Sequence, residues 1–418
     1  MKRSSLRRVK VLGGLVALLA MSALQAQELD HAPLARDASL SISVLLAQVL
    51  EHAPQALEGD ARAAQARAMT AQGDSWTAGR PSLQAEYIDD RTLSDLGQRE
   101  LTYGIALPLW RPGERGAMQA RGEHYDAQVA AWQDAFRLDM AGRLRHALAA
   151  MQEADALLAA EQLATADARE LLVIAEALFN AGETAQQDVL QARAVLLAQQ
   201  RNELTAEAAR VDAERNYATL TGLHVRPAAA HSESLAPVEE VGPEHPVLRL
   251  LRSDIDLAGS EITRAEVEAR GSPTLSIGSR RQRADDFSEN DNALALSISI
   301  PLGGQAHVDA ATSPARRARV DAEVNLLNTQ RALNLQLHEV EHELFTLRES
   351  LPLSEEQTRL ARQQWDMERA AFEAGESDMS QVVIALQQSR LSARELNALN
   401  LRHARLICEF NQIVGVLP

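Results

Sequence analysis

Two short segments of the chain alternate large apolar residues with small or polar ones. In LTYGIAL, residues 101–107, Leu, Tyr, Ile and Leu fall on one face, and Thr, Gly and Ala fall on the other. ALSISI, residues 295–300, repeats the pattern with Leu and Ile against Ala and Ser. A period of two predicts strands with one apolar face and one small or polar face. Polar loops join these strands to partner strands predicted at 82–88 and 274–279.

Each strand pair is followed by a long stretch with helical periodicity. No proline occurs between Pro112 and Pro227, and a helix is predicted from Gly113 to Phe179, a length of ~100 Å. Apolar residues step along both stretches by three and four, which is the spacing of a coiled-coil seam. The seam residues are Leu144, Ala147, Met151, Ala154 and Leu158 in the first stretch, and Leu337, Val340, Leu344, Leu347 and Leu351 in the second.

Both helical stretches end in a similar turn. FNAGETAQQDVLQA occupies residues 179–192, and FEAGESDMSQVVIA occupies residues 372–385. Gly182 suits the left-handed cap that ends a helix, and Gly375 stands at the matching place in the second turn. Each turn is therefore predicted to be the far tip of a helical hairpin. Pro352 is expected to break or kink the second long helix, because proline lacks the backbone N–H.

These matched features belong to a duplication that spans most of the chain. Pro108 and Pro301, at the strand exits, are 193 residues apart, as are the two tip turns. Pro81 and Pro273, which precede the strands, are 192 residues apart. The one-residue difference is expected in the first polar loop, where an insertion costs least.

The sequence therefore predicts five parts. They are a signal peptide at 1–26, an N-terminal periplasmic segment at 27–53, a first repeat at 54–223 with its strand pair at 82–108, a linker rich in Pro and small residues at 224–245, and a second repeat at 246–416 with its strand pair at 274–301. Each repeat begins with a helix, predicted at 54–79 and 246–271, and ends with the long hairpin.

The charge of the chain limits its partners. Residues 1–26 combine a basic start, a short apolar run and small residues before a cleavage after Ala26, as export signals do. They contain five basic and no acidic residues, so removing them changes the formal net charge from −16 to −21. This acidity argues against nucleic acid as a partner and suits cations. Cys408 is the only cysteine, so no lipid anchor is expected near the cleavage.

Four strands in one chain are too few to close a membrane barrel. Bacterial membrane barrels have at least about eight strands, and an open apolar sheet would aggregate through its edges. Several chains can remove those edges by pooling their strands. The sequence therefore predicts a mainly α protein with a small membrane β-barrel portion, which is shared between chains and continued by helical hairpins.

The order and spacing of these features resemble the TolC-type outer-membrane efflux channels. The resemblance rests on the duplication, on SLSISVLLAQVLEHAPQAL before the first repeat's long helix, on LPLW and IPLG at the strand exits, and on the two tip turns. ALPLWRPGERG is most similar to the CzcC-like heavy-metal efflux subgroup. The resemblance implies a homotrimer with a 12-strand barrel in the outer membrane of a Gram-negative cell and a helical tunnel in the periplasm.

The same resemblance implies the function and the partners. The chain would be the outer-membrane channel of a tripartite system that exports heavy-metal cations. It would contact outer-membrane lipid, a periplasmic adaptor protein and an inner-membrane RND pump. It would not be an enzyme, and no catalytic, cofactor-binding or metal-binding residues are expected. Export of organic drugs or solvents through the same architecture is the alternative.

Within the family, the hairpin tips dock the adaptor and form the periplasmic gate. The docking role is implied for Gly182, Glu183, Thr184, Gly375, Glu376 and Ser377. The gate region is implied for Asp188, Asp378, Gln381 and Ile384. Gln381 and Ile384 are non-acidic where the family usually has acidic residues, so Glu376 and Asp378 are the alternative sources of charge at the second tip.

Two functions of other classes compete with the channel. HEVEH, residues 338–342, matches the HExxH motif of zinc metalloproteases, with Glu339 as the general base. The duplication sets Arg145 and His146 against His338 and Glu339, so the first repeat does not preserve the motif. A periplasmic coiled-coil scaffold would leave the alternating strands unexplained. The remaining histidines are expected to be scattered, without a ligand cluster, and Cys408 is expected to be a buried apolar residue.

Overall fold

The structure is a computed structural model of the 418-residue chain, and it describes residues 32–92, 94, 96–238 and 240–418. The signal peptide predicted at 1–26 lies outside the described residues. The chain divides into two compact units. The strand unit consists of Pro54–Arg137 and Glu240–Leu335, and the hairpin unit consists of Met1–Ala53, Leu138–Glu239 and Gln336–Pro418, apart from the residues that are not described.

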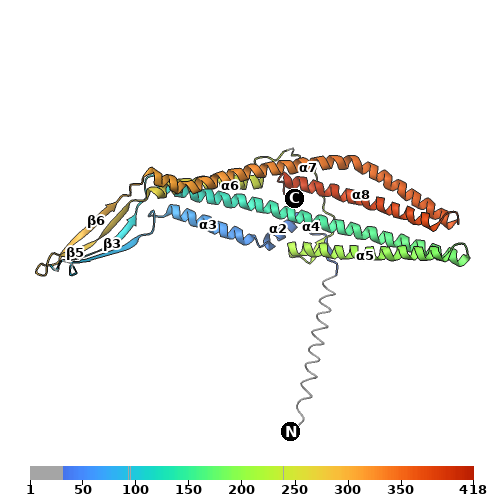
Figure 1. The fold of residues 1–418 in the computed structure, drawn as a ribbon, viewed down its shortest axis with the longest axis horizontal. Coiled ribbons are helices and arrows are strands. Elements are labelled where there is room, and N and C mark those ends of the chain that lie inside the picture. The colour runs from blue at the N-terminus through green and yellow to red at the C-terminus, as the bar shows by residue number, and fades with distance from the viewer. Residues whose placement is uncertain (1–31, 93, 95, 239) are drawn as a thin grey trace, which may run out of the picture. The chain divides into compact units, whose positions relative to one another are not determined.

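The strand unit contains one antiparallel sheet of four strands in the order β2-β3-β5-β6 (Figure 1). The strands are β2 (Ser82–Asp89), β3 (Arg99–Pro108), β5 (Thr274–Arg283) and β6 (Asp291–Ser299). All four strands were predicted, β3 and β6 from the alternating pattern and β2 and β5 as their partners. The unit also contains α3 (Ala56–Asp74), α6 (Pro246–Arg270) and the first parts of the long helices α4 (Glu114–Ala181) and α7 (Gln305–Glu373).

The register of the sheet separates its two faces by chemistry. One row across the four strands is entirely apolar and exposed, and it consists of Leu83, Ile105, Ile277 and Leu296. The adjacent row on the other face is small or polar, and it consists of Gln84, Gly104, Gly278 and Ala295. A Cβ atom at Gly278 would lie 2.2 Å from the carbonyl oxygen of Tyr103, so no larger residue fits there. The apolar face has no cover within this unit.

The hairpin unit is built from four long helical segments. They are the later parts of α4 and α7 together with α5 (Gln186–Thr221) and α8 (Met379–Ile413). A buried cluster joins all four through Leu171, Ala192, Trp365, Phe372 and Leu386. Several residues of the predicted seams are also buried, namely Leu144, Met151, Ala154, Leu337, Val340 and Leu347. None of the helices in the described residues is long and apolar enough to cross a membrane.

The structure corrects one expectation and adds one element. Of the break or kink expected at Pro352, the break is wrong, because α7 continues through it to Glu373. Leu347 and Ser354, on either side of that proline, are buried in the hairpin unit, so packing offsets the cost of ~3 kcal/mol that an interior proline carries. The sequence also missed a short parallel pair, β1 (Ala35–Asp37) and β4 (Val225–Pro227), which holds the start of the linker.

The N-terminal segment contributes one helix to the hairpin unit. This helix, α2 (Ile42–His52), begins at Ser41, whose side-chain oxygen accepts a hydrogen bond from the backbone N–H of Val44 at 3.4 Å. Leu45 and Val49 of α2 are fully buried. The segment before the first repeat is therefore part of the packed core of this unit.

Candidate functional site

The first hairpin tip ends α4 with a defined hydrogen-bonded cap. Gly182 has φ +82°, in the left-handed region that favours glycine. Its N–H donates to the carbonyl of Phe179 at 2.9 Å, and the N–H of Glu183 donates to the carbonyl of Leu178 at 2.9 Å. These two bonds are those of the Schellman motif.

The second tip ends α7 in the same way. Gly375 has φ +73°, and its N–H donates to the carbonyl of Phe372 at 3.0 Å. The N–H of Glu376 donates to the carbonyl of Ala371 at 2.8 Å. Nothing lies within 4 Å of a Cβ built at Gly182 or at Gly375. Glycine therefore serves the backbone conformation at both tips and is not needed to make room.

Several polar side chains at the tips are used inside their own turns. The carboxylate of Asp188 accepts hydrogen bonds from the Thr184 hydroxyl and, at 3.3 Å, from the backbone N–H of Ala185, which precedes α5. At the second tip the hydroxyl of Ser377 donates to Oε2 of Glu368 at 2.9 Å. Asp188 thus caps the start of α5.

The other tip residues are exposed to solvent in the single chain. Glu183 and Glu376 follow the two glycines and are exposed. Asp378 and Gln381 are exposed at the start of α8, and the Ile384 side chain is 58% exposed one turn later. The intervening residues of α8, such as Val382 and Val383, point into the core.

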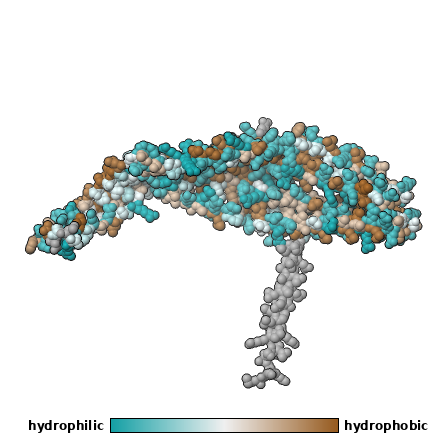
Figure 2. Space-filling view, viewed as in Figure 1, coloured by the Kyte–Doolittle hydropathy of each residue, from teal (hydrophilic) through white to brown (hydrophobic). Residues whose placement is uncertain are grey.

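Two helices of the hairpin unit carry exposed apolar residues at a spacing of seven. In α5 these residues are Leu190, Leu197 and Leu204, and in α7 they are Leu353, Leu360 and Met367. Apolar residues are visible among polar ones on the helical surface in Figure 2. A heptad-spaced apolar stripe is the surface against which another helix packs. Within the described residues neither stripe is covered.

The HEVEH segment does not form a protease site. His338 and His342 are both exposed, with their ring centroids 6.5 Å apart. Glu339 lines a cavity of ≈450 Å³ between α4, α7 and α8, and neither histidine lines that cavity. The general base and the two expected ligands are therefore not directed at one place.

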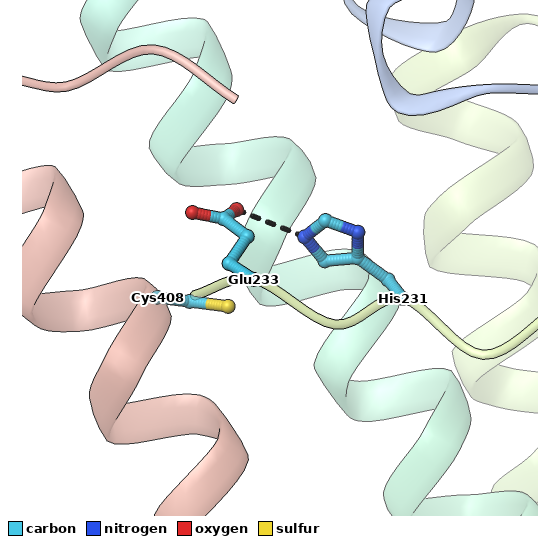
Figure 3. Close-up of side chains that lie close together, drawn as sticks. All are labelled: His231, Glu233 and Cys408. Carbon is cyan, nitrogen blue, oxygen red and sulfur yellow. Dashed lines mark hydrogen bonds and ion pairs between the residues drawn. The ribbon is translucent and has the colours of Figure 1, made fainter. Parts of the chain in front are cut away.

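A different cluster joins the linker to α8. His231, Glu233 and Cys408 bring their ligand-type atoms within 4.8 Å of one another (Figure 3). This corrects the expectation that the histidines lie scattered without a cluster. The linker that carries His231 and Glu233 has no periodicity, so no sequence pattern predicts this contact with α8.

The carboxylate of Glu233 is surrounded by hydrogen-bond donors. Arg145 donates to both oxygens, from Nε to Oε1 and from Nη2 to Oε2, each at 2.8 Å. Nδ2 of Asn411 donates to Oε2 at 2.8 Å, and Nε2 of His231 lies 2.9 Å from Oε1. Arg145 also donates to the side chain of Gln412 and to the backbone of Val416, so the linker is fastened to α4, to α8 and to the C-terminal end.

This arrangement shifts the pKa values of two groups in opposite directions. Burial opposes the charge of Glu233, but the donors His231, Arg145 and Asn411 outweigh it and lower its pKa from 4.5 to about 2. Burial is the main cause that raises the pKa of the Cys408 thiol to about 11, and the nearby charge of Glu233 adds to it. Cys408 is buried, as expected, but it borders polar groups as well as apolar ones.

The fold is shared with solved outer-membrane proteins. The outer membrane protein VceC of Vibrio cholerae matches with a TM-score of 0.73 and 16% identity, over 90% of this chain and 96% of VceC. The CmeC outer membrane channel of Campylobacter jejuni matches with a TM-score of 0.69 and 13% identity, over 91% of this chain and 89% of CmeC. The MtrE outer membrane channel of Neisseria gonorrhoeae has a TM-score of 0.68 and 15% identity, over 90% and 89%.

The sequence itself matches a family profile. Residues 45–223 match the profile of the outer membrane efflux proteins. Over these residues the chain is similar to the outer membrane efflux proteins. No protein of curated function matches it significantly.

The profile match and the shared fold both make the chain similar to the TolC-type outer-membrane efflux channels. Such channels transport and do not catalyse. Channels of this family form homotrimers with a periplasmic helical tunnel, and they work with adaptor proteins and inner-membrane pumps.

The hydrogen-bonded ion pair of Glu233 and Arg145 predicts that the stability of the protein depends on pH. Because folding lowers the pKa of Glu233 from 4.5 to about 2, its charge stabilises the folded protein above pH 4.5. This stabilisation, ~3 kcal/mol, is lost as the pH falls from 4.5 toward 2. Glu233→Gln should therefore lower the melting temperature at pH 7, and the difference from wild type should narrow below pH 4.5.

Thermal unfolding followed by circular dichroism between pH 7 and pH 3 measures this difference. Glu244→Gln, at an exposed position in the same linker, is the matched control and should melt like wild type. A deficit that is the same at pH 7 and pH 3 would show that the charge of Glu233 is not what stabilises the linker.

Proposed function

We propose that this efflux protein is the outer-membrane channel of a tripartite RND-type system that exports heavy-metal cations. The observation that carries the proposal for a channel is the four-stranded sheet with one exposed apolar face and two free edges. The proposal for heavy metals is supported by the ALPLWRPGERG segment and by the acidic net charge of −16.

The assembly follows from the surfaces that one chain leaves uncovered. The edge strands β2 and β6 each leave one row of backbone groups unpaired in the sheet. Three copies joined edge to edge would form a barrel of 12 strands with apolar rows such as Leu83 to Leu296 facing lipid. The heptad stripes of α5 and α7 would pack against neighbouring copies and form the helical tunnel.

The hairpin tips are the proposed docking surface for the adaptor. Glu183 and Glu376 are exposed beside glycines that hold the same cap at both tips. Thr184 and Ser377 would shape the turns through their hydrogen bonds to Asp188 and Glu368. The gate is proposed at Asp378, Gln381 and Ile384, whose side chains are exposed at the start of α8, with Asp188 holding the first tip.

The N-terminus and the repeats complete the proposal. Residues 1–26 would direct export and be removed, and the mature chain would be held in the membrane by its sheet without a lipid anchor. The repeats at 54–223 and 246–416 would give the trimer six similar hairpins, and the segment at 224–245 would link them.

The test of the cargo is growth inhibition of a deletion strain and its complemented partner. The panel contains zinc, cobalt, cadmium, nickel, copper and silver salts beside cationic dyes and antibiotics. Sensitivity confined to metals is expected. Sensitivity confined to organic compounds would overturn the metal cargo and favour drug or solvent export. Recovery of the mature chain as a water-soluble monomer would overturn the channel itself.

The tips supply a second test. Gly182→Val and Gly375→Val place a β-branched residue at positive φ, which costs at least ~1–2 kcal/mol at each cap. Export by the double variant should fail, measured as loss of complementation, while the protein still reaches the outer membrane as an oligomer.

Gly259→Val is the control for the tip variant. Gly259 lies within α6 and does not have a positive φ. Nothing lies within 4 Å of a Cβ atom added to it. This variant should export like wild type. Normal export by the double tip variant would remove the docking role from the tips.

A further inference from the structure

Two residues of the cluster of His231, Glu233 and Cys408, namely His231 and Cys408, line a small cavity of ≈10 Å³ next to Arg145 and Arg405. A cavity of ~10–15 Å³ holds one water-sized particle. Figure 3 shows the side chains of His231, on the linker, and Cys408, on α8, pointing toward each other beside Glu233. The cluster therefore combines a thiol, an imidazole and room for one ion.

We propose that Cys408 and His231 form a binding site for one soft monovalent metal cation, of the Cu⁺ or Ag⁺ class. Glu233 lies beside the ion without binding it. This site goes beyond the proposed function and does not depend on it, because binding here is separate from transport of the cargo.

The ligand atoms suit this class of ion. Thiolate sulfur selects soft metals, and imidazole nitrogen is a common second ligand. With metal–sulfur and metal–nitrogen lengths of ~2.3 and ~2.1 Å, as for zinc, a linear two-ligand site separates sulfur and nitrogen by ~4.4 Å. The atoms of the cluster lie within 4.8 Å of one another, so such an ion fits with little movement.

The charges decide between a monovalent and a divalent ion. Arg145 holds Glu233 through two hydrogen bonds of 2.8 Å, so the negative charge of Glu233 is already balanced. A monovalent ion that replaces the thiol proton leaves the charge of the buried cluster unchanged. A divalent ion would leave an extra positive charge beside a guanidinium that is buried, which is costly.

The donors around Glu233 also explain why it is not a ligand. Its two oxygens accept from Arg145, Asn411 and His231. Loss of the Cys408 thiol proton and binding of the ion to Nε2 of His231 remove the hydrogen bonds that these two side chains make with Glu233, and the imidazole proton then sits on Nδ1. Glu233 then keeps Arg145 and Asn411 and remains in place.

Binding releases one proton. The S–H bond of Cys408 breaks as the sulfur–metal bond forms, and no electron is transferred. Cys408 also lines the larger cavity of ≈450 Å³, which gives the proton and the ion a route. The bound ion would tie the linker to α8.

The test is isothermal titration of the detergent-purified, full-length protein with silver nitrate in chloride-free buffer. We expect one equivalent per chain, with one proton released, and a higher melting temperature of the silver-loaded protein. Cys408→Ser should abolish this binding, and His231→Ala should weaken it at least tenfold. The double variant His338→Ala with His342→Ala is the matched control and should bind like wild type, since that histidine pair is exposed on α7.

Two results would overturn the site. Unchanged silver affinity in His231→Ala would mean that Cys408 binds silver as an isolated thiol. Zinc acetate binding at least as tightly as silver to the same residues would contradict the charge argument. His231→Gln is a second variant that keeps a polar side chain, in case His231→Ala alters folding. Export in the growth panel has no part in either result.

Discussion

The structure depends on a sheet that one chain cannot complete. Each chain supplies four strands in the order β2-β3-β5-β6, and the outer strands leave backbone donors and acceptors without partners in the sheet. One face of the sheet is an exposed apolar surface, on which Leu83 is 82% and Leu296 is 66% exposed. In water, both the unpaired strand edges and the exposed apolar face favour aggregation. A lipid surface and further copies of the chain satisfy both, and this need connects the fold to the proposed channel.

The helices follow the same logic. In the hairpin unit Leu171, Trp365 and Leu386 bury one side of each helix in a common core. The other side of α5 and α7 keeps apolar residues at heptad spacing and exposed. Ion pairs such as Arg394 with Glu161, at 2.7 Å, hold α8 to α4 beside this core. A single chain thus has a packed core and leaves apolar helix surfaces uncovered for neighbouring chains, as expected for one subunit of an oligomeric tunnel.

The sequence predicted the elements whose signal is local. Alternation located β3 and β6, and the glycine of each tip marked the end of each long helix. The strand β5 extends to Arg283, beyond the predicted 274–279, because its backbone pairs with β3 as far as Arg99, and Arg280 also pairs with Glu100 at 2.7 Å. That pairing spans 180 residues, and no local pattern reports it. Pro352 misled the prediction because tertiary packing outweighs the local preference.

The sites were less predictable than the fold. The exposure of Glu183 and Glu376 follows from their place in a turn. The capping role of Asp188 follows only from its hydrogen bonds to Thr184 and Ala185 in the structure. The contact between the linker and α8 could not be predicted. Glu233 and Cys408 are far apart in the sequence, and the linker that carries Glu233 shows no hydrophobic periodicity. The buried ion pair of Glu233 with Arg145 fixes the path of that linker, and the metal site inferred beside it depends on the same pair.

The central claim is that sheets from three copies join edge to edge, and disulfide cross-linking between β2 and β6 tests it most directly. In a Cys408→Ser background, Leu83→Cys is combined in turn with Leu294→Cys, Leu296→Cys and Ile298→Cys, all on the apolar face. Within one chain two strands lie between these positions, a separation of ~14 Å that a disulfide cannot bridge. The account predicts that at least one pair gives, on oxidation in the membrane, a ladder of bands that ends at three chains. A ladder that ends at two chains or continues past three, or no cross-link for any pair, would contradict it.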